Sequence, residues 1–299
     1  MDFVPAPVST AGEASASAHA AAPAPALPLA PIAWFLGLLI LLFLPVLKPM
    51  VSEWVSDESM GHAFFVPLVA GFIVWREREH IMAQPVKPFW PAILLVIWGF
   101  FQMMLGFLGA DFFIARTAFL IAIVGVIWTL AGTRVLRSLA YPLFLLVFMI
   151  RIPLFVNQQI TFPLQIFASK VAAGTLGLLG IPVLRNGNII ELASQQLQVV
   201  EACSGIRSLL SLAFLSFAYS YFFDHRVWMR IVLFLCTIPI AITTNSLRIT
   251  ITGVLSEFNT KLAEGVYHEF EGWVIFMLAL IALVAVHRLI CRFAGPSHV

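Results

Sequence analysis

The chain has 299 residues, of which 61% are hydrophobic and only 11% are charged, and its mean hydropathy is +0.98. Soluble globular domains carry roughly 25% charged residues, so this composition excludes an ordinary soluble protein and indicates a polytopic membrane protein. The formal net charge is only +2 and the basic residues are scattered, so a nucleic-acid partner is not expected.

The first 30 residues are rich in Ala, Pro and Ser. Such a composition offers little to bury and its prolines interrupt helices, so we expect a disordered cytoplasmic tail over 1–30. The remainder, 31–295, is expected to form a single transmembrane domain, because no repeat or long linker divides it.

Apolar runs follow the tail, most of them close to the roughly 20 residues that a helix needs to cross the hydrocarbon core. The second run is short and reaches this length only if its helix starts near Met60. We therefore expect an all-α polytopic membrane protein with about eight transmembrane helices. The runs lie at 32–50, 63–75, 90–110, 112–131, 139–156, 203–223, 227–254 and 273–290.

Basic residues fall mainly on one side of these expected spans, which is the side of both termini. The positive-inside rule then predicts a plasma (inner) membrane protein with cytoplasmic termini. The opposite loops, SEWVSDESMGH and EFNTKLAEGVYHEFEG, are more acidic. The basic residues are Arg76, Arg78, Lys87, Arg134, Arg137, Arg226, Arg230, Arg288 and Arg292.

The longest segment outside the expected spans, 157–202, separates the fifth span from the sixth. Its first part, 157–183, mixes Gln, Thr, Ser and Lys with apolar residues, which is typical of an amphipathic helix in the outer interface. Its second part, 185–202, carries an Asn-Gly turn signal and strand-like stretches either side of 193–196. This pattern favours a small outer hairpin before the sixth span.

An arginine lies within the seventh expected span. Its insertion costs at least about 2.5 kcal/mol at a helix centre, so Arg248 should face a protein interior or a wet cavity. The polar run 243–246, which includes Asn245, directly precedes it and favours a lined cavity. Two interpretations stay open. Arg248 either awaits an anionic group or reaches the interface and pairs with Glu257 or Glu269.

A cysteine lies at the start of the sixth expected span, between Glu201 and Arg207. A helix N-terminus and a nearby arginine both favour the thiolate, the form of Cys203 that attacks carbonyl groups. Ser204 and Gly205 would leave amide N–H groups of the first turn available to an oxyanion. The alternative is that Cys203 only packs against its neighbours.

The other two cysteines, Cys236 and Cys291, are expected to be packing residues. No CxxC pattern or Cys/His ligand spacing is apparent, so neither a metal site, a disulfide framework nor another cofactor is expected.

His268 offers the general base that a cysteine nucleophile commonly uses, although a loop histidine beside acids is often only solvated. Of the seven histidines, only His268 and His62 fall on the outer side with Cys203.

Together these blocks resemble the exosortase and archaeosortase family of membrane-embedded cysteine transpeptidases. The resemblance rests on EACSGIRS around Cys203, NSLRI around Arg248 and HEFEGW around His268, with GHAFFVP and VWRER nearer the N-terminus. It covers essentially everything after residue 50. Ala63 is a departure, because Gly would be expected after His62.

The resemblance implies that Cys203 is the nucleophile, His268 the general acid/base and Arg248 the group that stabilises the oxyanion or orients the substrate. Arg207, Asn245, Glu201 and His62 are candidate supporting or substrate-binding residues. We expect the three implied catalytic residues to lie close together on the extracytoplasmic face.

The substrates implied are secreted proteins held in the bilayer by a C-terminal signal. Such a signal has a Pro-Glu-Pro-like (PEP-CTERM) motif, an apolar helix and a basic tail. After cleavage, the protein would be transferred to an unknown envelope acceptor. If water took the place of the acceptor, the enzyme would be a protease. Arg151, Arg185 or Arg207 are candidates to pair with an acidic residue of the motif.

Two other functions stay open. A small-solute transporter would use Arg248 and residues 243–246 to line a path, but no internal repeat is seen and the polar groups gather on the outer side. A noncatalytic assembly factor for exopolysaccharide export would need Cys203 only for packing, so Cys203→Ser would be harmless.

Overall fold

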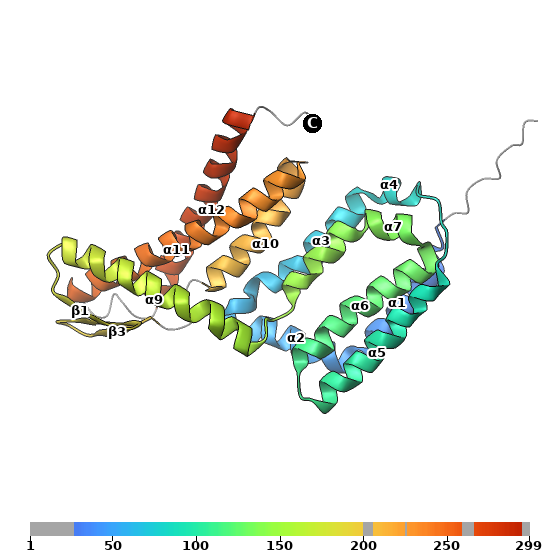
Figure 1. The fold of residues 1–299 in the computed structure, drawn as a ribbon, viewed down its shortest axis with the longest axis horizontal. Helices are drawn as coiled ribbons and strands as arrows, with labels where there is room; N and C mark the ends of the chain where they lie inside the picture. The colour runs from blue at the N-terminus through green and yellow to red at the C-terminus, as the bar shows by residue number, and fades with distance from the viewer. Residues whose placement is uncertain (1–26, 200–205, 225, 259–265, 295–299) are drawn as a thin grey trace, which may run out of the picture.

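The computed structural model describes residues 27–199, 206–224, 226–258 and 266–294, which are helical apart from one small sheet (Figure 1). The expected tail thus falls largely outside the described residues, and the first helix already begins at Leu29. The helices are α1 Leu29–Leu42, α2 Leu44–Ser56, η1 Glu58–Phe64, α3 Phe65–Arg76, α4 Arg78–Met82, η2 Trp90–Ala92, α5 Ile93–Leu108, α6 Phe112–Ala131, α7 Thr133–Ser138, α8 Ala140–Leu145, η3 Leu146–Met149, α9 Leu154–Leu178, α10 Ile206–Phe223, α11 Val227–Phe258 and α12 Val266–Ala294.

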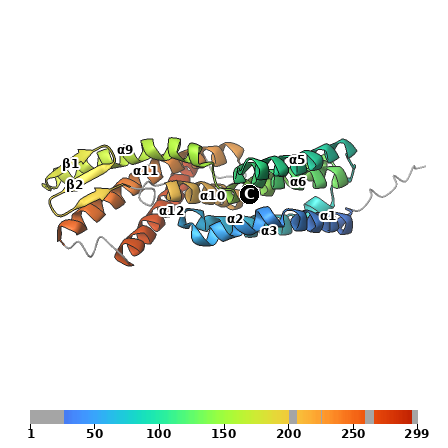
Figure 2. The same ribbon diagram turned by 90° about the horizontal axis from the view of Figure 1, so that it is seen from below.

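The helices form two groups side by side (Figure 1). One group contains α1 to α8, and in Figure 2 α1, α2 and α3 lie beneath α5 and α6. The other group contains α9 to α12 together with the sheet. The second group holds Arg248 in α11 and position 268 in α12, two of the places around which the sequence predicts catalysis.

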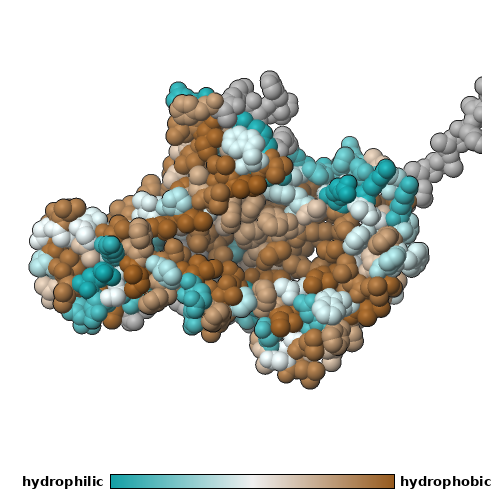
Figure 3. Space-filling view, viewed as in Figure 1, coloured by the Kyte–Doolittle hydropathy of each residue, from teal (hydrophilic) through white to brown (hydrophobic). Residues whose placement is uncertain are grey.

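The surface of the molecule is mostly apolar, as expected for helices solvated by lipid (Figure 3). Hydrophilic residues on this face gather near α4 and α7 and near the strands. In the part of the chain that the structure describes, five helical segments are long and apolar enough to cross a membrane, or up to seven if each of two bent helix pairs is one span. A polytopic membrane protein is therefore confirmed, but the count of eight spans is not. The five segments are Ser59–Arg76, Trp90–Leu108, Phe112–Ala131, Val227–Glu257 and Phe270–Phe293.

The first apolar run, 32–50, is divided into two helices that are bent by 75°. Pro45 lies at the start of α2. Because proline has no N–H and its ring clashes with the preceding turn, α1 cannot continue through this position. The second run behaves as the sequence predicts, since its helical segment starts at Ser59, next to Met60.

The fifth apolar run, 139–156, is also divided, and α9 is bent by 80° from Ala140–Met149. Pro153 cannot donate the hydrogen bond that would continue the helix to the carbonyl of Met149. That carbonyl instead accepts a hydrogen bond from Trp54 Nε1 at 3.1 Å. A helix along the membrane surface makes such an angle with a spanning helix.

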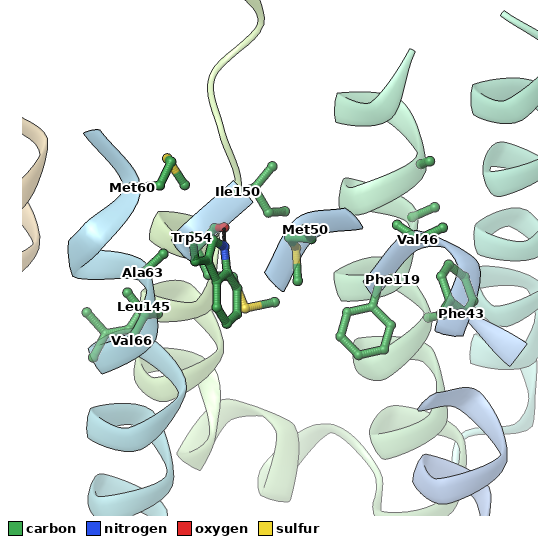
Figure 4. Packing of buried hydrophobic residues seen from close by; sticks show 14 of the residues in the cluster. Phe43, Val46, Met50, Trp54, Met60, Ala63, Val66, Phe119, Leu145 and Ile150 are labelled. Atoms are coloured by element: carbon green, nitrogen blue, oxygen red, sulfur yellow. Dashed lines mark hydrogen bonds between the residues drawn. The ribbon is translucent and has the colours of Figure 1, made fainter. Parts of the chain in front are cut away.

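A cluster of buried apolar side chains holds α2, η1, α3, α6 and α8 together (Figure 4). Phe43 and Phe119 meet at a ring-centroid distance of 5.5 Å. Ala63, which departs from the expected Gly, is fully buried in this cluster, so its methyl group contributes to the packing. The residues labelled in Figure 4 are Phe43, Val46, Met50, Trp54, Met60, Ala63, Val66, Phe119, Leu145 and Ile150.

An ion pair lies beside this cluster. Arg116 of α6 is only 3% exposed, and its guanidinium donates to both carboxylate oxygens of Glu53 in α2 at 2.7 and 2.8 Å. Such a bidentate pair fixes the two helices relative to each other in one arrangement.

The sheet follows α9 and is antiparallel in the order β1 (Val183–Asn186), β2 (Ile189–Leu192) and β3 (Gln196–Gln198). Gly187 takes a positive φ of 64° in the turn after Asn186, where the sequence carries its Asn-Gly signal. Ile190 is fully buried and packs in one cluster with Ala172 of α9 and Ile249 of α11. The sheet and α9 thus hold the part of α11 that carries Arg248.

Candidate functional site

Arg248 lies in α11, and its guanidinium rests on the backbone of Gly272 in α12. A Cβ atom at Gly272 would be 3.3 Å from Nη2 and 3.4 Å from Cζ of Arg248. The absence of a side chain at this position leaves room for the guanidinium close to the helix backbone. The arginine therefore faces another helix of the protein, as its cost in lipid requires.

Glu271, beside Gly272, interacts electrostatically with Arg248. Its carboxylate also accepts from Thr252, whose Oγ1 lies 2.9 and 3.1 Å from the two oxygens. The sequence instead pointed to Glu257 or Glu269. Glu257 accepts hydrogen bonds from Ser194 at 2.8 and 3.2 Å, whereas the side chain of Glu269 lies outside the described residues.

The polar run before Arg248 makes most of its hydrogen bonds within its own helix. The hydroxyls of Thr243, Thr244 and Ser246 each donate to the carbonyl four residues earlier in α11, at 2.8 Å. Asn245 is different, because it is only 5% exposed and its Nδ2 has no hydrogen-bond partner among the described residues. Buried amide groups are nearly always paired, so this donor is the feature of the run that calls for a ligand.

Asn245 lines a small cavity of about 10 Å³ where α9, α10 and α11 meet. Leu209, in the first turn of α10, lines the same cavity and so brings the start of α10 next to Asn245. A wider groove of about 230 Å³ runs between α9 and α11 and is lined by Phe167, Val171, Thr175, Ile242, Thr243, Ser246, Leu247 and Thr250.

Arg207 lies at the start of α10 and acts electrostatically on Asp57, which precedes η1. Arg151 forms an ion pair with the same carboxylate at 2.9 Å. Burial alone would raise the pKa of Asp57, but hydrogen bonds from Ser59 and the two arginines outweigh it and hold that pKa below its ordinary value of 3.8. Two arginines are thus gathered around one carboxylate beside α10.

His62 packs against the same helix. Its Nδ1 lies 3.4 Å from Ser211 Oγ, and its ring centroid lies 6.2 Å from that of Phe214. Ser211 is one turn after Arg207, so the GHAFFVP block contacts the beginning of α10.

The remaining predicted residues are described only in part. Cys203 and Glu201 lie outside the described residues, and α10 is described from Ile206. The backbone of position 268 lies in the first turn of α12, but the side chain of His268 is not among the described ones. It precedes Gly272 by one helical turn, so the backbone places position 268 on the face of α12 that meets Arg248.

Comparison with known proteins gives one match. The family of transmembrane exosortases (Exosortase_EpsH) matches residues 54–285, which is most of the chain. The chain belongs to the exosortase family. No curated protein and no solved structure matches it. The matched range includes the EACSGIRS, NSLRI and HEFEGW blocks on which the resemblance rests.

At the other end of α12, this exosortase carries a second group of polar side chains, which the sequence did not predict to be a site. Asp224, His287 and Cys291 place a carboxylate oxygen, an imidazole nitrogen and a sulfur within 4.8 Å of one another. A signal for two of them was present, because His287 and Cys291 are four residues apart in a helix and share a face. Asp224 is distant in sequence and gave no signal. Cys291 packs against an apolar cluster, as expected, and it also contacts Asp224 and His287, which was not expected.

Proposed function

We propose that this exosortase is a membrane cysteine transpeptidase or protease that cleaves the C-terminal, membrane-anchored sorting signal of secreted proteins. Cys203 is the nucleophile, His268 the general acid/base and Arg248 the oxyanion-stabilising cation. The observation that carries the proposal is the contact of Arg248 with Gly272, one turn from His268. A half-buried cation held beside a candidate acid/base is an arrangement suited to a reaction that develops negative charge.

The proposed chemistry has two steps. The Cys203 thiolate attacks the scissile carbonyl carbon, so that a C–S bond forms and the C–N bond breaks after the oxyanion collapses. The imidazolium of His268 gives its proton to the departing amine. An amine or hydroxyl group of the acceptor, or a water molecule in its place, then attacks the thioester. It passes a proton to His268 and releases the Cys203 thiolate.

Charge stabilisation falls to Arg248 and Asn245 in this proposal. Glu271 and Gly272 hold the guanidinium of Arg248 on α12. Asn245 lies one turn earlier in α11, and its Nδ2 has no partner within the described part of the chain. Donors that are fixed before the reaction are worth roughly 3 kcal/mol each, because no reorganisation is needed when the charge appears.

Recognition of an acidic residue in a PEP-CTERM-like motif falls to Arg207 and Arg151. Both act on Asp57 beside the start of α10, so they are held at one place. Arg185 is a weaker candidate, because it lies in β1 and donates to the carbonyl of Gly187 at 2.7 Å. The reaction is proposed for the extracytoplasmic face of the inner membrane, with both termini cytoplasmic.

A transporter is less well supported. Its path was suggested by the polar run of α11, yet the hydroxyls of Thr243, Thr244 and Ser246 are bound to their own helix. Their O–H donors are therefore not available to a passing solute.

The test is to co-express the chain with a protein that carries a tail of motif, apolar helix and basic cluster, tagged before its motif. We expect the wild type to remove a tail-sized mass on an immunoblot. Cys203→Ser, Arg248→Ala and His268→Ala variants of equal membrane abundance should leave the substrate intact.

A matched control is Cys236→Ser, which removes a thiol from the middle of α11 and should process the substrate normally. Processing by the Cys203→Ser variant would overturn the proposed nucleophile. It would favour an assembly role in which Cys203 only packs.

A further inference from the structure

Asp224, His287 and Cys291 join the junction between α10 and α11 to the last turns of α12. Asp224 is fully buried and His287 is 7% exposed. His287 Nε2 lies 3.4 Å from Asp224 Oδ2 and 3.4 Å from Cys291 Sγ, and Cys291 Sγ lies 3.9 Å from Asp224 Oδ2. The three atoms face one another across a small triangle.

The sides of this triangle are also compatible with the coordination of a metal ion. An N–H···O bond is most often about 2.9–3.0 Å long, so the contact between His287 and Asp224 is stretched for one. Zinc bonds of about 2.0 Å to nitrogen or oxygen and about 2.3 Å to sulfur place tetrahedral ligand atoms about 3.3–3.6 Å apart. The two distances from His287 Nε2, both 3.4 Å, fit this range. The distance of 3.9 Å between Cys291 Sγ and Asp224 Oδ2 would have to shorten by a few tenths of an ångström.

Tyr219 supports the required form of the imidazole. Its hydroxyl lies 2.9 Å from Nδ1 of His287, and the two rings meet edge to face at 87°. When Nδ1–H donates to this hydroxyl, the lone pair of Nε2 points toward Asp224 and Cys291. Histidines that bind metals usually donate their other ring N–H to a partner of this kind.

Arg226 is the cation already present at the cluster. Its Nη2 lies 2.7 Å from Asp224 Oδ2 and 3.4 Å from Cys291 Sγ. Arg226 therefore contacts both the carboxylate and the sulfur, so one guanidinium holds these two side chains in position.

We propose that Asp224, His287 and Cys291 bind a divalent transition-metal ion of the zinc class. One carboxylate, one imidazole and one thiolate are ligands that zinc and cobalt accept in tetrahedral sites, with the fourth position open to water. The metal would fasten the C-terminal end of α12 to the α10–α11 junction. His287 and Cys291 lie beyond the residues that match the exosortase family, 54–285, and the site does not depend on the proposed peptidase activity.

The test uses the full chain in detergent, stripped with a chelator, and cobalt(II) alone as the probe. The chain carries Cys203→Ser, so that its proposed nucleophile cannot contribute a thiolate. We expect one cobalt ion per chain and a near-ultraviolet charge-transfer band from thiolate to cobalt. Cys291→Ser should abolish the band, and Cys291→Ser and His287→Ala should each weaken binding at least tenfold.

The matched control is Cys236→Ser, which removes a thiol of α11 that the cluster does not include. It should bind cobalt with the same affinity and the same band. The site is refuted if the parent binds no stoichiometric cobalt, if the band survives Cys291→Ser, or if Cys236→Ser removes it.

A second measurement covers the case in which a variant loses its fold. Ligands that bind only the folded state raise its unfolding temperature. Zinc should therefore raise the thermal midpoint of the parent and of Cys236→Ser but leave that of Cys291→Ser unchanged. An equal rise in all three chains would show that zinc binds elsewhere and would overturn the assignment.

Discussion

The guanidinium of Arg248 in α11 packs on the backbone of Gly272 in α12, where a Cβ atom would stand 3.3 Å from Nη2. Any side chain at position 272 must push the guanidinium away. Gly272→Ala needs a shift of only a few tenths of an ångström, so processing of a tailed substrate should fall severalfold. Gly272→Val should lower processing by about tenfold or more, because a displaced guanidinium no longer stabilises the negative charge of the transition state.

The control for Gly272 is Gly174 in α9, which has no neighbouring atom within 4 Å of a Cβ position. Gly174→Ala and Gly174→Val should retain wild-type processing on the same immunoblot. Normal processing by Gly272→Val would show that the position of Arg248 is not important for the reaction.

The buried amide of Asn245, whose Nδ2 has no partner among residues 27–199, 206–224, 226–258 and 266–294, predicts that stability and activity change in opposite directions. Asn245→Ala removes this donor and introduces a better helix former, so the free energy of unfolding should stay constant or rise by about 1 kcal/mol. Substrate processing should nevertheless fall about tenfold or more. Thermal unfolding in detergent and the processing assay measure the two effects. A variant that is both stable and fully active would contradict a role in the site.

The ion pair between Glu53 and Arg116 predicts a large loss of stability when one partner is removed. Glu53→Gln leaves a guanidinium that is only 3% exposed without its counterion, which costs about 3 kcal/mol or more. Glu53→Gln combined with Arg116→Met should recover much of this loss, because no buried charge is then left. Thermal midpoints in detergent compare the two chains.

The exposed ion pair between Arg78 and Glu79, at 3.8 Å, serves as the reference for Glu53. Glu79→Gln should change the free energy of unfolding by less than about 1 kcal/mol. If Glu53→Gln were equally mild, the pair would not hold α2 and α6 together.

The ionised state of Asp57 predicts a pH-dependent stability. Its pKa in the folded chain is below the ordinary value of 3.8, so the folded state favours the carboxylate. The stabilisation is therefore present above about pH 4 and is lost as the pH falls through the folded pKa. Asp57→Asn should be less stable than the wild type at pH 7, and the difference in thermal midpoint should shrink below pH 4. A difference that does not change with pH would mean that the charge of Asp57 makes no contribution.

Hydropathy predicted a membrane protein and the start of the second span, but it did not show where the apolar runs bend. Apart from Lys48 and Arg151, the runs 32–50 and 139–156 are almost entirely apolar, so the bends at Pro45 and Pro153 appear only when backbone hydrogen bonds are counted. The carbonyl of Met149, which Pro153 leaves unpaired, has a partner in Trp54, and the sequence separation of 95 residues hid this contact.

The candidate site was predictable in its chemistry and less so in its contacts. The cost of a charge in lipid predicted that Arg248 faces protein, which its contact with Gly272 confirms. Its interaction with Glu271 was not predicted, because an acidic residue nearby in the sequence need not be on the facing side of a helix. The roles of Cys203 and His268 stay predictions.

The ion pair between Glu53 and Arg116 also determines when α2 can reach its final packing during synthesis of the chain. Glu53 leaves the ribosome 63 residues before its counterion, so α2 must wait for α6 before its carboxylate is neutralised. Trp54 waits longer still, because its acceptor is the carbonyl of Met149. The N-terminal helices of this protein therefore reach their final packing only after the middle of the chain has been made.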